Sequence, residues 1–235
     1  GRSAHQAVRA ARRCVQDGLA WVADIDLDWF SGRVQFDVLM ARVARKVDDR
    51  KILRLIRSYL EAGVMAGGIK QATAEGTPQG SPLSPVLSNV MLDDLDRELW
   101  KRGHRFVRYD DDLRVFVRSE RAAQRVFESV CGVIGRRLKL KVNREKSSIR
   151  HAAQAALPSF GFFFDGPRVG IRITPQAIAR LKDQGFTILL VEQNFRFAST
   201  VADRYYVMEH GKIIDTFANS ELQANMSKLH EYLGV

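Results

Sequence analysis

The sequence predicts an α+β fold, an antiparallel sheet with helices on one face, from two patterns. In the stretch 106–117, apolar residues alternate on either side of Asp110, Asp111 and Asp112, which is the period of two half-buried strands that meet at an acidic hairpin tip. Upstream and downstream of it, apolar residues recur at helical spacing. The resulting order of strand, helices, hairpin, helix and strand is typical of helices packed on an antiparallel sheet.

Each further element has its own signal. Apolar residues of 19–27 alternate with Asp24, Asp26 and Asp28, which indicates a strand. Helices are predicted at 4–18, where Gly18 ends the helix, at 38–47, at 52–63, at 84–103, where Ser84 and Pro85 suit a helix start, and from Ser119 to Ile134. A last strand is predicted at 138–142 from the alternation of Leu138, Leu140 and Val142.

The three acids of the hairpin tip suggest a metal site. Carboxylates crowded at a turn repel one another unless cations or basic neighbours offset their charge. A solvated acidic loop is the alternative, because Asp suits turns for local reasons. If Asp26 lies on a neighbouring strand, three carboxylates would share two Mg²⁺ ions, the arrangement used for in-line phosphoryl displacement.

Bulk properties bound the class of protein. With 46% apolar and 27% charged residues, the chain of 235 residues is expected to bury a sizeable core. No apolar run approaches the roughly 18 residues that a membrane helix needs, and residues 1–5 lack the core of a signal peptide, so we expect a cytoplasmic protein without membrane insertion. Cys14 and Cys131 lack the spacing of zinc ligands. The absence of an initiator Met predicts a fragment of a longer protein.

The charge is unevenly distributed. The net charge is +10, which fits a polyanionic partner. From residue 184 onward the chain has four Lys or Arg and six Asp or Glu, a net charge of −2, whereas the preceding residues carry 33 and 21, a net charge of +12. The basic excess therefore lies entirely upstream of residue 184.

Six blocks in residues 1–182 resemble the reverse transcriptases and maturases encoded by group II introns. They are Gly1–His5, Asp24–Leu27, the loop Thr77–Pro85, the hairpin with Tyr109, Asp111 and Asp112, the segment Leu138–Ser147, and Phe160–Phe162. Their order matches the family's order across nearly four-fifths of the chain. The resemblance implies a polymerase palm with incomplete fingers and thumb.

The resemblance also implies roles for particular residues. Asp26, Asp111 and Asp112 would be catalytic and bind two Mg²⁺ ions, while a primer 3′-hydroxyl attacks a dNTP opposite an RNA template. Lys146 either is a solvated lysine or neutralises the departing pyrophosphate, and Gln79 either is a turn residue or contacts nucleotide or template. The remaining candidates are Ser31, Pro78, Gly80, Tyr109 and Asn143 for nucleotide and template, and Arg2, Arg108 and Arg144 for phosphates.

Two positions depart from the family's pattern. Ser31 stands where a bulky aromatic residue normally meets the sugar, so discrimination against ribose is expected to weaken. Asp110 stands where the family has a small apolar residue, which adds negative charge beside the two ligands. Together with the truncation, these departures imply impaired polymerase activity.

The segment 183–235 resembles the C-terminal end of an ABC-transporter ATPase of the branched-chain amino-acid importers. The apolar run Phe186–Val191 predicts a buried strand of a parallel sheet, and two short strands are predicted about His210 and Gly211. Gln193 matches the switch position of that family. The phosphate-binding loop is missing from the sequence, so this tail is expected to be a relic of an ATPase that docks on membrane permeases.

Three functions follow in order of preference. The first is an RNA-directed DNA polymerase fragment, and the second is a catalytically silent maturase-like fragment that binds group II intron RNA through its phosphates. The third, an importer ATP-binding subunit, conflicts with the missing phosphate-binding loop.

Overall fold

The computed structural model describes residues 3–27, 34–62, 64–66, 69–71, 83–157, 159–192 and 195–233. The chain divides into two units, Gly1–Arg172 and Ile173–Val235, which are described separately. Among the described residues no helix has both the length and the apolar character required to span a bilayer.

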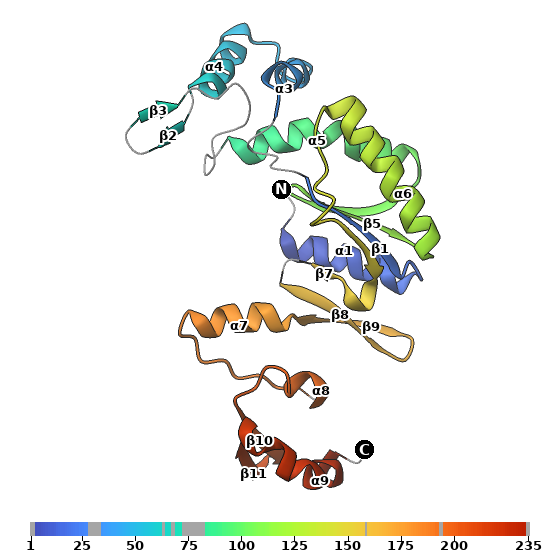
Figure 1. Ribbon diagram of the computed structural model, residues 1–235, viewed down its shortest axis with the longest axis vertical. Coiled ribbons are helices and arrows are strands. Elements are labelled where there is room, and N and C mark those ends of the chain that lie inside the picture. Colours follow the sequence, from blue (N-terminus) through green and yellow to red (C-terminus); the bar gives the residue numbers. More distant parts are fainter. Residues whose placement is uncertain are drawn as a thin grey trace. The chain divides into compact units, whose positions relative to one another are not determined.

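The first unit is built on a four-stranded antiparallel sheet with the order β4-β5-β1-β6 (Figure 1). These strands are β1 (Trp21–Ile25), β4 (Arg105–Tyr109), β5 (Asp112–Val117) and β6 (Ser148–His151). The central strand β1 pairs with β5 on one side and β6 on the other, with Val22 opposite Phe116 and Arg150. Both strands predicted around the acidic tip and the strand predicted at 19–27 are therefore present.

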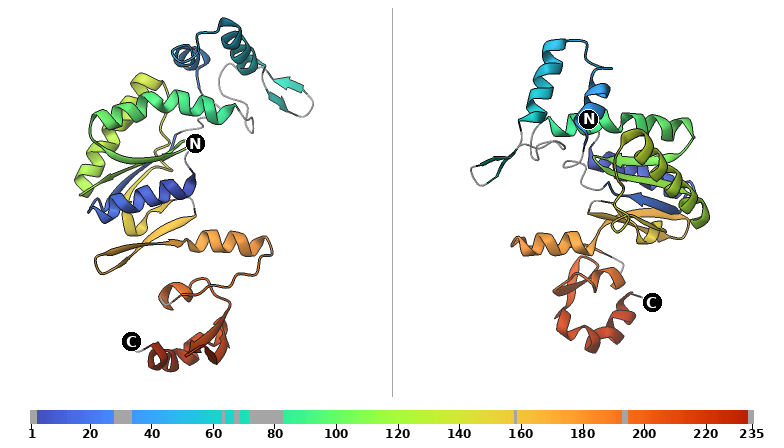
Figure 2. Two further views of the ribbon diagram at one scale, coloured as in Figure 1. Left: turned by 180° about the vertical axis from the view of Figure 1, so that it is seen from behind. Right: turned by 45° about the horizontal axis from the view of Figure 1, so that its top comes forward.

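Both faces of this sheet are covered. Ala23, Ile25 and Val115 belong to one apolar core with α5 (Ser84–Lys101) and α6 (Glu120–Val133), as the helical spacing predicted. Val22 and Phe116, which point to the opposite face, pack against α1 (Ala4–Gln16). Figure 2 shows α1 and α6 on opposite sides of the strands. The expected α+β fold is confirmed, and α1 adds a helix on the second face.

A second small sheet lies on the α1 side of the first unit. It has the order β7-β8-β9, with β7 (Ala156–Leu157), β8 (Phe160–Asp165) and β9 (Arg168–Ile173), and it follows the 3₁₀ turn η2 (Ala152–Gln154). Leu157, Phe162 and Val169 share the apolar core of α1. The side chain of Gln16 joins helix and hairpin, because its Nε2 donates to Pro167 O and its Oε1 accepts from Val169 N.

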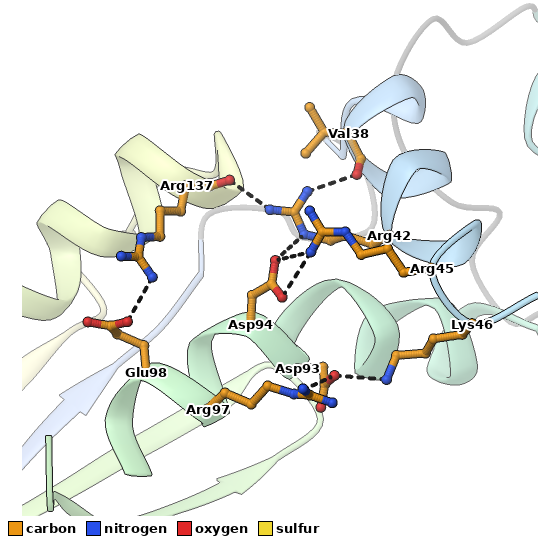
Figure 3. Close-up of polar contacts among 9 residues, drawn as sticks. All are labelled: Val38, Arg42, Arg45, Lys46, Asp93, Asp94, Arg97, Glu98 and Arg137. Atoms are coloured by element: carbon orange, nitrogen blue, oxygen red, sulfur yellow. Dashed lines mark hydrogen bonds and ion pairs between the residues drawn. The ribbon is translucent and has the colours of Figure 1, made fainter. Parts of the chain in front are cut away.

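The helical pair predicted before residue 63 consists of α3 (Phe36–Val43) and α4 (Arg50–Glu61), followed by the short strands β2 (Val64–Ala66) and β3 (Ile69–Gln71). A charged network joins α3 to α5 (Figure 3). The nearly buried Arg42 donates to Val38 O and Arg137 O, and its Nε lies 3.0 Å from Asp94 Oδ2. On the exposed side, Lys46 and Arg97 both contact Asp93.

The strand predicted at 138–142 is replaced by a different conformation. The chain leaves α6 through the π-helical turn η1 (Ile134–Leu138), and Lys139 then takes a left-handed φ of 55°. Leu138 and Leu140 are buried in the core beneath α6, and only Val142 makes a bridge, to Leu27. The alternating apolar residues thus come from the end of a helix and from the irregular segment after it, and Leu138 and Leu140 are buried without forming a strand.

The second unit contains α7 (Pro175–Asp183), α8 (Phe195–Ala198), the hairpin β10 (Arg204–Glu209) and β11 (Lys212–Ala218), the turn η3 (Asn219–Glu221) and α9 (Leu222–Leu233). The two strands predicted about His210 and Gly211 are present, and both turn residues have positive φ, as a tight hairpin turn requires. The predicted strand Phe186–Val191 is absent: residues 186–192 have no regular structure, and Leu189 and Val191 are 86% and 90% exposed. A buried parallel strand needs neighbouring strands, and the described part of this unit provides none for it.

Candidate active site

The acidic tip of the sheet is the turn between β4 and β5. Tyr109 pairs with Asp112, so Asp110 and Asp111 form the two turn residues. Asp110 adopts a left-handed φ of 56°, a conformation that Asp tolerates better than most residues. The tip lies at the end of the hairpin of β4 and β5, with Tyr109 41% exposed beside it.

Asp26 follows directly after β1, next to this tip. Because Ile25 pairs with Leu113, Asp26 continues the register toward Asp112 on the neighbouring strand. Its backbone is fixed from the other side of β1: Asp26 N donates to Ser147 Oγ at 3.0 Å, and Asn143 N donates to Asp26 O at 2.9 Å. The backbone register thus sets Asp26 next to Asp112 on the neighbouring strand.

Burial and the charges of neighbouring acids affect the pKa values of the carboxyl groups near the tip. Burial, together with the negative charges of Asp110, Asp112 and Asp26, raises the pKa of the Asp111 carboxyl above its ordinary value, against the effect of a backbone hydrogen bond. Burial also raises the pKa of Asp24, and the charge of Arg114 only partly opposes this effect. Burial and the neighbouring acids therefore both disfavour the ionised form of the Asp111 carboxyl.

Arg114 on β5 is a basic group that pairs with two of the acids on the sheet. Its side chain is buried, with Nε 3.3 Å from Asp24 Oδ1 and Nη1 3.8 Å from Asp112 Oδ2. Nε makes no hydrogen bond of good geometry, so the interaction is an ion pair across β1 and β5. The sequence analysis missed Arg114, because a single Arg in an apolar strand carries no signal of its partner.

Asn143 and Lys146 lie on the turn behind Asp26. Asn143 Oδ1 accepts hydrogen bonds from the backbone N of Glu145 and of Lys146. Ser147 Oγ donates to Asn143 O at 2.6 Å and accepts from Asp26 N. These two bonds join the turn directly to Asp26, a candidate metal ligand. The side-chain oxygen of Asn143 thus shapes the turn, and Lys146 is exposed on it.

Two arginines expected to contact phosphates are paired within the protein. The guanidinium of Arg108 binds Asp96 through Nη2 at 2.6 Å and also donates to Asn89 and to Asp110 O. Arg144 forms a two-pronged pair with Glu128 and lies over the ring of Phe127. In this structure Arg108 stabilises the acidic turn, and Arg144 joins the turn at 143–147 to α6.

Several candidates from the sequence lie outside the described residues. They are Arg2, Ser31, Pro78, Gln79, Gly80 and Gln193.

The donor chemistry of the tip fits Mg²⁺, which prefers oxygen ligands from carboxylates. Burial, and after it the charges of the neighbouring acids, raises the pKa of Asp111, and a bound cation would oppose both effects. Within the part of the chain that the structure describes, no three His, Cys, Asp or Glu side chains converge closely enough to hold one ion. The side chains of Asp26, Asp111 and Asp112 would therefore have to rotate toward one another to share it.

Comparison with known proteins places the chain in a family. The model of the family described as reverse transcriptase (RNA-dependent DNA polymerase) matches residues 1–198. Protein YkfC of Escherichia coli is 28% identical over 206 residues, covering 72% of this chain and 52% of YkfC. The group II intron-encoded protein LtrA of Lactococcus lactis is 30% identical over 96 residues, 41% of this chain and 16% of LtrA.

A further relative and a solved structure complete the comparison. BraG, a high-affinity branched-chain amino acid transport ATP-binding protein of Pseudomonas aeruginosa, is 39% identical over 59 residues, 25% of each chain. The apo telomerase of Candida tropicalis has a similar fold, with a TM-score of 0.58 at 13% identity, covering 77% of this chain and 38% of the telomerase. The chain spans about half the length of YkfC and less of the other proteins. By the family match over most of its length, the chain belongs to the reverse transcriptase (RNA-dependent DNA polymerase) family.

Proposed function

We propose that residues 1–182 are the palm of an RNA-directed DNA polymerase of the group II intron type. The observation that carries the proposal is the register of β1 and β5, which sets Asp26 beside the turn of Asp111 and Asp112. The family match and the similarity to LtrA support the same function. The substrates would be an RNA template, a primer and dNTPs, and group II intron RNA is a further candidate partner.

Asp26, Asp111 and Asp112 would hold the divalent metal that this family requires. When bound, two Mg²⁺ ions would lower the pKa of an attacking hydroxyl and neutralise charge on the leaving oxygen. The hydrogen bonds that Asp26 N donates to Ser147 Oγ and Asp26 O accepts from Asn143 N hold the backbone of Asp26 in place, so one of the metal ligands would be fixed by the fold before substrate binds.

The other candidate residues are assigned by position. Lys146 is exposed on the turn that is bonded to Asp26, from which its ammonium would neutralise or protonate pyrophosphate. Tyr109 flanks the acidic tip and would contact the primer or nucleotide. Asn143, Pro78, Gln79 and Gly80 stay candidates for nucleotide or template, Ser31 for the sugar, and Arg2 for a phosphate.

Primer extension on an RNA template with Mg²⁺ tests the polymerase proposal. Asp111→Asn is expected to abolish nucleotide addition, while the matched change Asp110→Asn in the same turn is expected to leave it or raise it. Lanes with rNTPs test sugar selectivity at Ser31. Equal extension by wild type and Asp111→Asn would disprove the site assignment.

A silent RNA-binding fragment is the second candidate function. The net charge of +12 before residue 184 favours it, because phosphate contacts supply sequence-independent affinity. If neither wild type nor Asp111→Asn extends a primer, but both bind RNA with the same salt dependence, this second function replaces the first.

We also propose that residues 183–235 derive from the C-terminal end of an ABC-transporter ATPase, with Gln193 at the former switch position. The match with BraG supports this origin. Without a phosphate-binding loop in the sequence, the tail is expected not to bind ATP. Isothermal titration with ATP and Mg²⁺ checks this, and micromolar binding would contradict the proposal.

A further inference from the structure

The exposed face of α1 gathers basic side chains. Arg9, Arg12 and Arg13 stand at positions i, i+3 and i+4 of the helix, which places them on one face, and Gln16 continues that face by one turn. The helix from Ala4 to Gln16 contains no acidic residue. The charge of this arginine face is therefore not balanced within the helix.

Carboxylates of neighbouring elements do not balance it either. Several other arginines of the first unit are paired, for example Arg45 with Asp94, Arg105 with Asp17 and Arg108 with Asp96. Within the described residues, no carboxylate lies at ion-pair distance from Arg9, Arg12 or Arg13. Asp17, at the end of the same helix, points its carboxylate to Arg105 on β4.

Arg12, in the middle of the arginine face, is held in position by the hairpin of β8 and β9. Arg12 Nε donates to Val169 O at 2.6 Å, and Gln16 bonds to both Pro167 O and Val169 N. These bonds fix α1 against β9 and leave the two Nη groups of Arg12 without a partner among the described residues. An open groove of about 270 Å³ is lined by Arg9, Arg12, Arg13 and Gln16. The guanidinium of Arg12 thus loses little further freedom when an anion binds, and the exposed Arg9 and Arg13 flank it on the same face.

We propose that the arginine face of α1 binds the phosphodiester backbone of a nucleic acid, at a site separate from the acidic tip. Planar guanidinium groups match phosphate oxygens with paired hydrogen bonds, and groups spaced along one helix face suit a run of phosphates. Such contacts hold a strand without reading its sequence. This binding does not depend on polymerase activity, because none of its residues belongs to the acidic tip.

The test removes two of the three arginines and leaves Arg12, which also bonds to β9. The variant Arg9→Gln/Arg13→Gln is compared with Arg121→Gln/Arg125→Gln on α6, where both residues are exposed and have no ion-pair partner among the described residues. Both variants lose the same charge. Fluorescence anisotropy measures the affinity of the full chain for a labelled single-stranded RNA and for its hybrid with DNA over a range of salt.

The α1 variant is expected to bind more weakly for every sequence, with the slope of log K against log salt reduced by about 1.4 for single-stranded RNA. The α6 variant is expected to retain most of the salt dependence that wild type shows. Loss with RNA alone, with the hybrid alone or with both supports the proposal and identifies the form bound. Equal losses in the two variants, or no loss in the α1 variant, would overturn it.

Three controls keep this test independent of folding, of general charge attraction and of catalysis. Thermal melting of the α1 variant is expected to match that of wild type, since Arg9 and Arg13 are exposed. Polyglutamate competes for any basic surface, so competition equal to that of RNA per unit charge would also overturn the proposal. Asp111→Asn is expected to bind RNA as wild type does, so failure of the polymerase function leaves this result unaffected.

Discussion

Arg114 Nε lies 3.3 Å from Asp24 Oδ1, an ion pair between neighbouring strands one residue pair away from the acidic tip. The side chains are only 9% and 22% exposed. Burial still raises the pKa of Asp24, so pairing does not fully compensate for desolvation of the carboxylate. The first prediction concerns the cost of breaking this pair.

Arg114→Met is expected to lower the free energy of unfolding by about 3 kcal/mol, because it leaves Asp24 buried without its cation. Adding Asp24→Asn to Arg114→Met is expected to recover part of that loss, since the unpaired charge is then removed. Urea denaturation of the two single variants and the double variant measures the coupling. Strictly additive effects would show that the pair contributes no interaction energy.

Two neighbouring acids on α5, Asp93 and Asp94, are expected to contribute very different amounts to the stability of the fold. Asp94 contacts the nearly buried Arg42, whereas Asp93 contacts Lys46 and Arg97, which are 44% and 71% exposed (Figure 3). Asp94→Asn is expected to destabilise the fold by about 3 kcal/mol, because the buried guanidinium loses its charge partner. Asp93→Asn is expected to cost less than about 1 kcal/mol, as exposed pairs do. Equal losses in thermal melting would contradict this contrast.

The sequence predicted the frame of the fold well. The alternation in 19–27 and 106–117 and the helical spacing in α5 and α6 are local patterns, and each leads to the element observed. The acids at the hairpin tip were predicted in the same way, since a turn between two strands brings its own residues together. Local periodicity thus sufficed for these elements.

The wrong strand predictions and the missed contacts have physical causes that local sequence patterns do not encode. Leu138 and Leu140 alternate like a strand, yet they are buried at a π-helical turn followed by a left-handed residue. Phe186–Val191 is apolar like a parallel strand, but no strand in the described part of its unit pairs with it, and only Ile188 packs against a small apolar cluster. The bond from Asp26 N to Ser147 and the pair of Arg108 with Asp96 join elements distant along the chain, so no spacing indicates them.

The pKa of His104 predicts a pH dependence of stability. Burial, and then the positive charge of Arg102, lower the pKa of the folded imidazole below its unfolded value of about 6.5. As pH falls through that value the unfolded state binds the proton first, so stability is present above about pH 6.5 and is lost below it. The free energy of unfolding is therefore expected to fall between about pH 7 and pH 5 more steeply in wild type than in His104→Gln. The control Lys101→Gln, which removes a charge that does not titrate in this range, should keep the wild-type slope.

The hairpin of β8 and β9 contains a close approach that only glycine permits. A Cβ placed on Gly170 would overlap the ring of Phe163, and that ring is also covered by Arg172, whose guanidinium lies 5.4 Å from its centre. Gly170→Ala is expected to cost about 1–3 kcal/mol, because the ring must move and part from the guanidinium. Thermal melting of Gly170→Ala, Phe163→Leu and the double variant checks whether the Phe163 ring causes this loss of stability. If the ring is the obstacle, adding Gly170→Ala to Phe163→Leu lowers the melting temperature little, whereas an equal drop in both backgrounds would place the cost in the backbone of β9.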